Sequence, residues 1–258
     1  MVKLKKAFKK AANEARAAFI PYFILGLPTI EKSIEIITEA AEYFDVLELG
    51  IPFSDPVADG PTIQEGALKA LENKYSMDDF FKATKEISKK IKKPIVYMLY
   101  YNQVFGYGTE NFMSNAKDAG VSGLIIPDLL PETDKQFIST AKKHDIETIF
   151  LATPVTKNKR LKMVLNYSKG FLYLTSLVGI TGERDNVNND LENLANNVKK
   201  ESTLPVCVGF GVSSAQHVEN ISKFADGVIV GSAIVKRIIN NDKPLEFIKE
   251  LFEATKKK

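Results

Sequence analysis

The chain has 258 residues, of which 45% are hydrophobic and 26% are charged, and its formal net charge is +3. This length accommodates one large α/β domain or two small ones, with a core of ordinary size. The charge is near neutral, and the lysines are not gathered with aromatic residues on one face, so we expect no nucleic-acid partner. No apolar run approaches the roughly 20 residues of a membrane span, and the charged first residues lack the apolar core of a secretory signal.

The predicted elements alternate between helices and short apolar strands. An amphipathic helix is expected from the N-terminus to about Ala17. Eight nearly continuous apolar runs follow, as expected for strands covered on both faces, at residues 19–25, 46–49, 95–99, 123–126, 148–151, 171–175, 206–208 and 227–230. Helix-period segments lie at residues 31–43, 62–73, 77–91, 110–119, 132–143, 157–167, 189–200, 213–222, 233–239 and 243–255.

This alternation predicts the fold class. Strands and helices that alternate over short links form a parallel sheet. Eight such units in about 250 residues match the size of a (β/α)8 TIM barrel, here with an extra N-terminal helix. A doubly wound open sheet is the alternative, although it usually has fewer strands and a switch point. The sequence has no Pro/Ser-rich linker or compositional break, which indicates a single domain over residues 1–258.

Two carboxylates lie close together around the second predicted strand. Glu48 stands near the end of its apolar run, and Asp59 stands in the Pro/Gly-rich loop that follows. An unpaired charge is costly to bury, and a buried carboxyl responds with a raised pKa. In a barrel, reactive residues gather at the carboxyl ends of the strands. The pair therefore suits acid–base chemistry at that end.

Glycine-bearing loops follow the last three predicted strands. They contain Gly-Ile-Thr-Gly at 179–182, Gly-Phe-Gly at 209–211 and the pair Gly231–Ser232. Glycine lets backbone N–H groups approach a ligand closely, and a helix N-terminus adds a favourable dipole. One such loop alone would indicate only a tight turn. Three of them at the usual phosphate position of a barrel predict a phosphate-binding site.

Cysteine and histidine are too sparse for a metal cluster. The single cysteine, Cys207, lies in an apolar run and cannot form a disulfide within the chain, so we expect a reducing, cytoplasmic location. His144 and His217 lie in helical segments bordered by lysines and are expected at the surface. No metal site is predicted.

A long motif around the two carboxylates carries a family resemblance. Residues 47–64, LELGIPFSDPVADGPTIQ, strongly resemble the signature of the tryptophan synthase alpha subunit. The resemblance covers nearly the whole chain, through FIPY at 19–22, YYN at 100–102, GLIIPD at 123–128, Tyr173, GITG at 179–182, GFG at 209–211 and GSAIV at 231–235. The first motif is specific, whereas several phosphate-binding barrels share the glycine patterns.

The resemblance implies a retro-aldol cleavage of indole-3-glycerol phosphate to indole and glyceraldehyde 3-phosphate. It implies that Glu48 is the general acid and base at indole C3 and the glycerol hydroxyl. Asp59 would hydrogen-bond the indole N–H, and Tyr173 would assist positioning. The chemistry needs these groups, and each proton-transfer group typically contributes about 10²–10⁴ in rate. The resemblance implies no metal or organic cofactor on this chain.

The expected substrate-binding residues form two groups. The glycerol phosphate is expected on the backbone N–H groups of Gly182, Gly211, Gly231 and Ser232, with Thr181 in the same loop as Gly182. The indole is expected to pack against Tyr22, Met98, Tyr100, Ile125 and Phe210.

A partner is also implied. The family's alpha subunit binds a beta subunit that carries pyridoxal phosphate, in an alpha2beta2 heterotetramer, and indole passes between them. The loop at 53–60 and a polar, aperiodic and therefore mobile loop at 179–189 would close the site and meet the partner. Asp55 and Pro56 match interface positions.

Two positions depart from the family pattern. Leu27 stands where members often carry a polar or acidic residue, and Leu177 stands where some carry arginine. Both departures concern loop closure or communication with the partner rather than the acid–base pair.

Two other functions remain as alternatives. Another phosphate-binding barrel, such as a sugar-phosphate isomerase or indole-glycerol-phosphate synthase, is expected to use lysine or Cys/Asp pairs at strand ends, and no lysine lies well inside a strand end here. The second alternative is a binding or activating subunit with little catalysis of its own. The presence of Glu48, Asp59 and Tyr173 argues against it.

Overall fold

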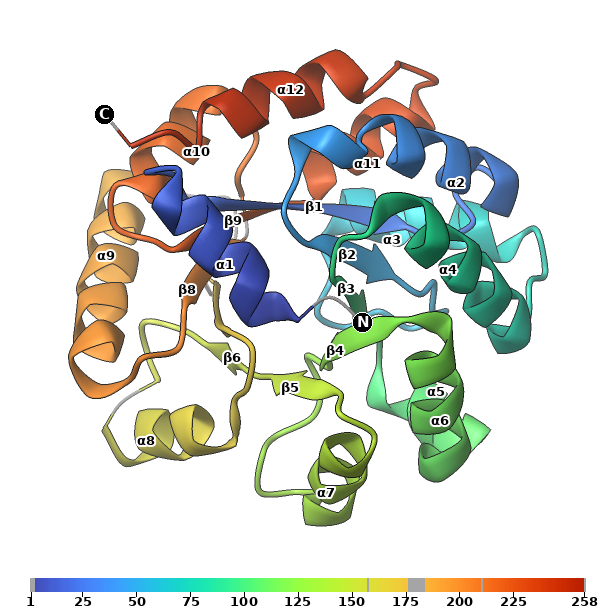
Figure 1. The fold of residues 1–258 in the computed structure, drawn as a ribbon, viewed down its shortest axis with the longest axis horizontal. Coiled ribbons are helices and arrows are strands. Elements are labelled where there is room, and N and C mark those ends of the chain that lie inside the picture. The colour runs from blue at the N-terminus through green and yellow to red at the C-terminus, as the bar shows by residue number, and fades with distance from the viewer. Residues whose placement is uncertain (1–2, 157, 176–183, 210, 258) are drawn as a thin grey trace.

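A parallel sheet that curls into a nearly closed barrel, with helices around it, forms the centre of the molecule (Figure 1). A computed structural model describes residues 3–156, 158–175, 184–209 and 211–257. The nine strands in these ranges run in the order β5-β4-β3-β2-β1-β9-β8-β7-β6. They are β1 (Ala18–Ile24), β2 (Leu47–Gly50), β3 (Ile95–Met98), β4 (Val121–Ile125), β5 (Glu147–Ile149), β6 (Leu151–Ala152), β7 (Leu172–Thr175), β8 (Val206–Gly209) and β9 (Gly227–Val230). The predicted TIM barrel is confirmed.

The fifth predicted strand is divided in two. The apolar run at 148–151 becomes β5, which pairs with β4, and β6, which pairs with β7. Phe150 lies between the two pieces, and its carbonyl accepts a hydrogen bond from the Tyr173 N–H at 3.2 Å. The prediction of one unbroken strand was wrong because the chain changes its pairing partner here, at the point where the barrel closes.

Each predicted helix has a counterpart in the structure. The helices are α1 (Leu4–Asn13), α2 (Ile30–Glu39), the 3-10 turn η1 (Ala41–Tyr43), α3 (Pro61–Leu71), α4 (Met77–Ile91), α5 (Tyr101–Tyr107), α6 (Thr109–Ala119), α7 (Lys135–Lys143), α8 (Asn158–Tyr167), α9 (Arg184–Glu201), α10 (Ala215–Ser222), α11 (Ser232–Ile239) and α12 (Leu245–Glu253). No helix in the described ranges is long and apolar enough to cross a membrane.

Three helix predictions need correction. The first helix ends at Asn13 rather than near Ala17, because Ala15 has a positive φ of 51° and β1 begins at Ala18. Helix α9 begins at Arg184, so residues 184–189 are helical rather than part of a loop. The apolar positions that reveal its helical period, such as Leu191, come later in the helix, and the pattern therefore marked only that part.

The third correction is α5, a helix that the sequence pattern does not predict. It is a single short helix of 7 residues directly after β3. The Gln103 side chain caps its first turn by accepting a hydrogen bond from the Tyr100 N–H at 3.0 Å. A helix this short offers too few turns for an apolar period to stand out.

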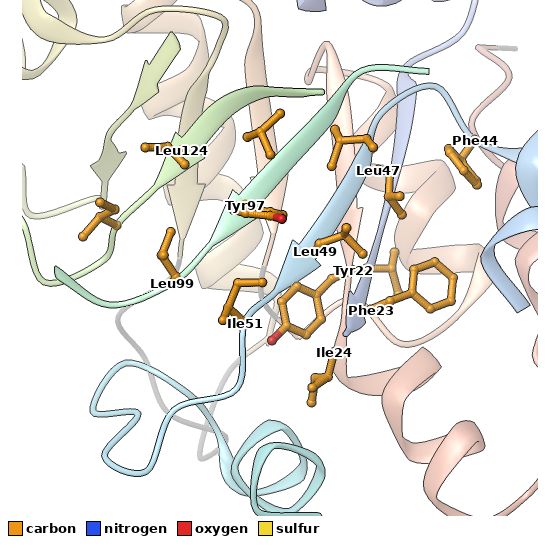
Figure 2. Close-up of a cluster of buried hydrophobic side chains, with 14 of the residues drawn as sticks. Tyr22, Phe23, Ile24, Phe44, Leu47, Leu49, Ile51, Tyr97, Leu99 and Leu124 are labelled. Atoms are coloured by element: carbon orange, nitrogen blue, oxygen red, sulfur yellow. The ribbon is translucent and has the colours of Figure 1, made fainter. Parts of the chain in front are cut away.

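Alternation along the strands separates two hydrophobic clusters. The outer cluster lies between sheet and helices, and Figure 2 shows part of it, with Phe23, Leu49 and Tyr97 in register on β1, β2 and β3. The inner cluster fills the barrel, where Leu4 and Phe8 of α1 cover the end at which the strands begin. Because successive side chains of a strand point to opposite faces, Glu48 points inward between its outward neighbours on β2.

A buried ion pair lies at the same end of the barrel as α1. The Arg16 guanidinium, 5% exposed, donates two hydrogen bonds to the carboxylate of Asp45, 2% exposed, at 2.5 and 2.7 Å. That carboxylate also accepts from the Phe19 N–H at 2.9 Å. Beside it, the Ala17 N–H donates to Thr255 and the Lys257 N–H donates to Ala15. These bonds join the start of β1 to the segment after α12.

Candidate active site

A cavity at the carboxyl ends of the strands collects most of the predicted site residues. It offers about 600 Å³ of empty space, counting the part that opens to solvent. Eight predicted residues line it, namely Tyr22, Glu48, Asp59, Met98, Tyr173, Gly211, Gly231 and Ser232. They come from elements that are spread along the whole sequence, namely β1, β2, β3, β7, α11 and connecting loops. The barrel therefore brings the two carboxylates together with Gly211 and the Gly231–Ser232 pair, from two of the three glycine-bearing segments.

Four further lining residues were not predicted, namely Gly60, Ile63, Val212 and Ile229. Each lies close in sequence to a predicted one. Ile229 could have been found from strand alternation, because its neighbours Val228 and Val230 belong to the outer cluster. The predicted residues Thr181, Gly182 and Phe210, and the departure at Leu177, lie outside the described residues.

Two predicted indole contacts do not line the cavity. Ile125 is fully buried among the side chains of the inner cluster. Tyr100 is 3% exposed, and its hydroxyl bonds to Asp59. Leu27, the other departure, is buried against the helices around β1, close to Gly66 of α3.

Glu48 is the most unusual side chain in the cavity wall. It is 1% exposed, and among the residues that the structure describes neither carboxyl oxygen has a hydrogen-bond partner. Burial, and secondly the charge of Asp59, raise the pKa of Glu48 to about 8. At neutral pH this carboxyl group therefore holds a proton that it can donate.

Asp59 has a different environment. Its carboxylate accepts a hydrogen bond from the Tyr100 hydroxyl at 2.9 Å. Burial raises the pKa of Asp59 to about 6, and the Tyr100 hydrogen bond opposes that rise. Near pH 7 the site thus holds one protonated and one ionised carboxyl group, which is the division of states that acid–base catalysis needs.

Two tyrosines each pack against the last glycine of the adjacent strand: Tyr22 of β1 against Gly50 of β2, and Tyr173 of β7 against Gly209 of β8. A Cβ atom at Gly50 would lie 2.0 Å from the Tyr22 hydroxyl, and one at Gly209 would lie 2.3 Å from the Tyr173 hydroxyl. Both positions therefore need glycine. Burial raises the pKa of each phenol well above its ordinary value, so both hydroxyls keep their protons and act as neutral donors.

The part of the cavity lined by Gly211, Gly231 and Ser232 is suited to an anion. Gly231 precedes α11 as its N-cap, and Ser232 is the first residue of that helix. Gly211 has a positive φ of 68°, and nothing lies within 4 Å of where its Cβ would be, so its backbone is open to a ligand. A helix N-terminus beside open backbone favours phosphate.

The predicted partner residues lie on the loop between β2 and α3. Asp55 is exposed, and its carboxylate accepts a hydrogen bond from the Ser54 hydroxyl at 2.5 Å. Pro56 is half-buried. Over the ranges that the structure describes, no group of three or more His, Cys, Asp or Glu side chains could hold a metal ion.

Comparison with known proteins gives consistent results. Residues 8–258 match a family model described as tryptophan synthase alpha chain. A tryptophan synthase alpha chain of Methanocaldococcus jannaschii is 42% identical over 92% of this chain and 84% of its own length. One from Arabidopsis thaliana is 38% identical over 99% and 94%, respectively.

Solved structures of tryptophan synthase chains have the same fold as this chain. A crystal structure of tryptophan synthase from M. tuberculosis contains a chain that is 32% identical, with a TM-score of 0.91 and complete coverage of both chains. The tryptophan synthase alpha subunit of Legionella pneumophila is 30% identical, with a TM-score of 0.89 over 99% of this chain and 98% of its own.

Proposed function

Because the chain belongs to the tryptophan synthase alpha chain family, we propose that Glu48 and Asp59 are the acid–base pair of that family's reaction. The chain is a lyase of tryptophan biosynthesis, and the reaction is the cleavage of indole-3-glycerol phosphate to indole and glyceraldehyde 3-phosphate. One observation carries the assignment of the pair. The carboxyl group of Glu48 is buried in the cavity wall with no hydrogen-bond partner among the described residues, so a substrate group is left to fill that role.

In the proposed mechanism Glu48 gives one proton to the substrate and later takes another proton from it. Protonated Glu48 donates its proton to C3 of the indole ring, which leaves a positive charge shared with the ring nitrogen. Ionised Asp59 accepts a hydrogen bond from the indole N–H and stabilises that charge. The Glu48 carboxylate then takes the proton of the glycerol hydroxyl next to the ring. A carbonyl forms there, the carbon–carbon bond breaks, and its electrons neutralise the ring.

Other residues of the cavity bind and orient the substrate in this proposal. The phosphate lies against the backbone N–H groups of Gly211, Gly231 and Ser232, where the α11 dipole stabilises its charge. Gly182 was predicted to join them. The neutral phenol of Tyr173 orients the substrate beside Glu48, and Tyr22 and Met98 cover the indole.

The pH dependence of indole release tests these roles. The reaction needs Asp59 ionised, which holds above pH about 6, and Glu48 protonated, which holds below pH about 8. We expect kcat/KM for the purified chain to be highest between those values and to fall about tenfold per pH unit outside them. A flat profile from pH 5 to 9 would contradict the pair. No indole release, with or without a beta subunit, would contradict the lyase.

We further propose that a tryptophan synthase beta chain docks over the mouth of the barrel, in an alpha2beta2 assembly. Four exposed apolar side chains lie on loops or a short helix after β2, β3, β4 and β6, at the carboxyl ends of the strands. They are Val57 (81% exposed), Phe105 (67%), Leu130 (46%) and Val155 (65%). Exposed apolar groups concentrated at one end indicate a protein contact. Asp55 and Pro56 lie beside Val57 and join the contact.

The docking proposal predicts a large effect at Phe105. We expect Phe105→Ala to weaken binding of the beta chain by tenfold or more, because aromatic anchors dominate such interfaces. Titration calorimetry with the purified beta chain measures this. Leu68→Ala is the matched control, since Leu68 is an exposed apolar residue (58%) within α3, away from those loops. Equal affinities for the two variants would exclude Phe105 from the interface.

The cofactor and location follow from the same proposal. The family of this chain does not itself bind pyridoxal phosphate. We assign that cofactor to the beta chain. Cys207 is buried with a free thiol, which supports a reducing cytoplasm as the location.

A further inference from the structure

Tyr100 connects the active-site loop to the element that follows β3. It is the N-cap residue of α5, and its phenol reaches the end of the loop that carries Asp59. The Tyr100 oxygen accepts a hydrogen bond from the Ala58 N–H at 3.0 Å and donates one to Asp59 Oδ2 at 2.9 Å. The Ala58 N–H can only donate, so the single phenol proton is directed to Asp59. That geometry favours Asp59 as a pure acceptor, which is its ionised form.

The same turn of α5 also holds the beginning of the loop. The Tyr100 ring stacks on Phe53, with centroids 5.2 Å apart and planes 25° apart. The Gln103 side chain accepts from the Tyr100 N–H at 3.0 Å and donates to the Pro52 carbonyl at 3.1 Å. Residues 52–53 and 58–59 are thus attached to the N-cap residue Tyr100 and to Gln103 in the first turn of the same helix. This arrangement fixes where the Asp59 carboxylate points.

We propose that Tyr100 is a positioning residue that keeps Asp59 oriented and ionised for the indole N–H, rather than a residue that packs against the indole. The inference rests on the proposed role of Asp59. The phenol is buried outside the cavity lining, so its contact with the substrate runs through Asp59.

The other ionisable groups that the structure describes around Asp59 do not lower its pKa. Glu48 on β2 stays protonated in the pH range where Asp59 ionises, and it is the Asp59 charge that helps raise the pKa of Glu48. Tyr22 on β1 and Tyr173 on β7 are neutral phenols in the same electrostatic neighbourhood. The charge of Asp128, after β4, adds to the rise in the pKa of Tyr100 that burial mainly causes. Its carboxylate accepts a hydrogen bond from the Tyr101 N–H at 2.9 Å. Among the described groups, the Tyr100 hydroxyl is the one that lowers the pKa of Asp59 against its burial.

The test is the pH profile of Tyr100→Phe, which keeps the ring on Phe53 and removes only the hydroxyl. A hydrogen bond to a charged group is worth about one pKa unit. We expect the acidic limb of kcat/KM to move up by about one pH unit. The loss is then about fivefold at pH 6 and small at pH 7.5 through ionisation alone. A purely structural role would lower activity at every pH and leave the limb in place, and that result would overturn the proposal.

Two further variants separate the possible failures. Tyr101→Phe is the matched control, because the Tyr101 hydroxyl donates to Asp134, the N-cap residue of α7, at 2.5 Å, and neither residue lines the cavity. Its acidic limb should stay where the wild-type limb lies, and a shift there would overturn the assignment to Tyr100. Asp59→Asn should lose turnover together with the acidic limb. If it keeps both, the proposed role of Asp59 fails. If it loses both while Tyr100→Phe keeps the wild-type limb, only the role of Tyr100 fails.

Discussion

Glu48→Gln should release indole about 10²–10⁴-fold more slowly than the wild-type chain, because the glutamine amide has the same shape but cannot act as an acid or a base near neutral pH. Its fold and phosphate binding should persist. Among the described residues the Glu48 oxygens have no hydrogen-bond partner, so the substitution breaks no bond there. Single-turnover indole release measures the rate, and calorimetric titration with glycerol phosphate measures the binding. A loss of folding would mean that Glu48 is structural.

Glu147→Gln is the matched control for that variant. Glu147 is only partly buried, but one of its carboxyl oxygens also has no hydrogen-bond partner among the described residues, and burial raises its pKa. It lies at the start of β5, the opposite end of its strand from the cavity. Its turnover should equal that of the wild type. An equal loss in both variants would indicate that replacing either carboxyl group disturbs the barrel.

Asp45→Ala should destabilise the fold by about 3 kcal/mol, because it leaves the buried Arg16 charge without its main partner. The midpoint of urea unfolding measures the change. The double variant Arg16→Met with Asp45→Leu should recover most of the loss, since apolar groups of similar volume replace a buried pair well. If the double variant is no more stable than Asp45→Ala, loss of the hydrogen bond to Phe19, rather than the unpaired charge, is the cause.

An exposed ion pair supplies the comparison for Asp45. On α12, Nζ of Lys249 lies 2.7 Å from Oε1 of Glu246, and the glutamate side chain is 83% exposed. Glu246→Ala should change the free energy of unfolding by less than about 1 kcal/mol. A similar loss for both variants would show that burial of the Arg16–Asp45 pair is not what makes it important.

Most of the barrel could be predicted because its strands are covered on both faces. Such strands appear in the sequence as short apolar runs, and each predicted run overlaps at least one strand. The division at Phe150 could not be predicted, since it depends on which strand pairs with each piece. The start of α9 at Arg184 could not be predicted either. A helix shows an apolar period in the sequence only where it packs against the rest of the protein, and among the side chains of α9 that the structure describes the buried ones begin at Leu191.

The site was predictable to the extent that strand alternation and neighbouring loops determine it. Glu48 lies inward because Leu47 and Leu49 lie outward. The hydrogen bond from Tyr100 to Asp59 was not predictable in this way. The hydrogen-bond partners of the Tyr100 hydroxyl are 41 and 42 residues away along the chain, and only the folded loop brings them together. An aromatic residue at a strand end looks the same in sequence whether it faces a ligand or a carboxylate.

The joining of β1 to β9 and to Thr255 has a consequence for the order in which the chain is synthesised. β1 is among the first elements made, whereas β9 and the segment after α12 are among the last. At ~5–20 residues per second, β1 waits on the order of 10–40 seconds for these neighbours. During that time its Ala18–Ile24 edge, apolar and unpaired, is a site where a nascent chain can associate wrongly. We expect α1, which is made before β1 and covers the same end of the barrel, to shield that strand while it waits.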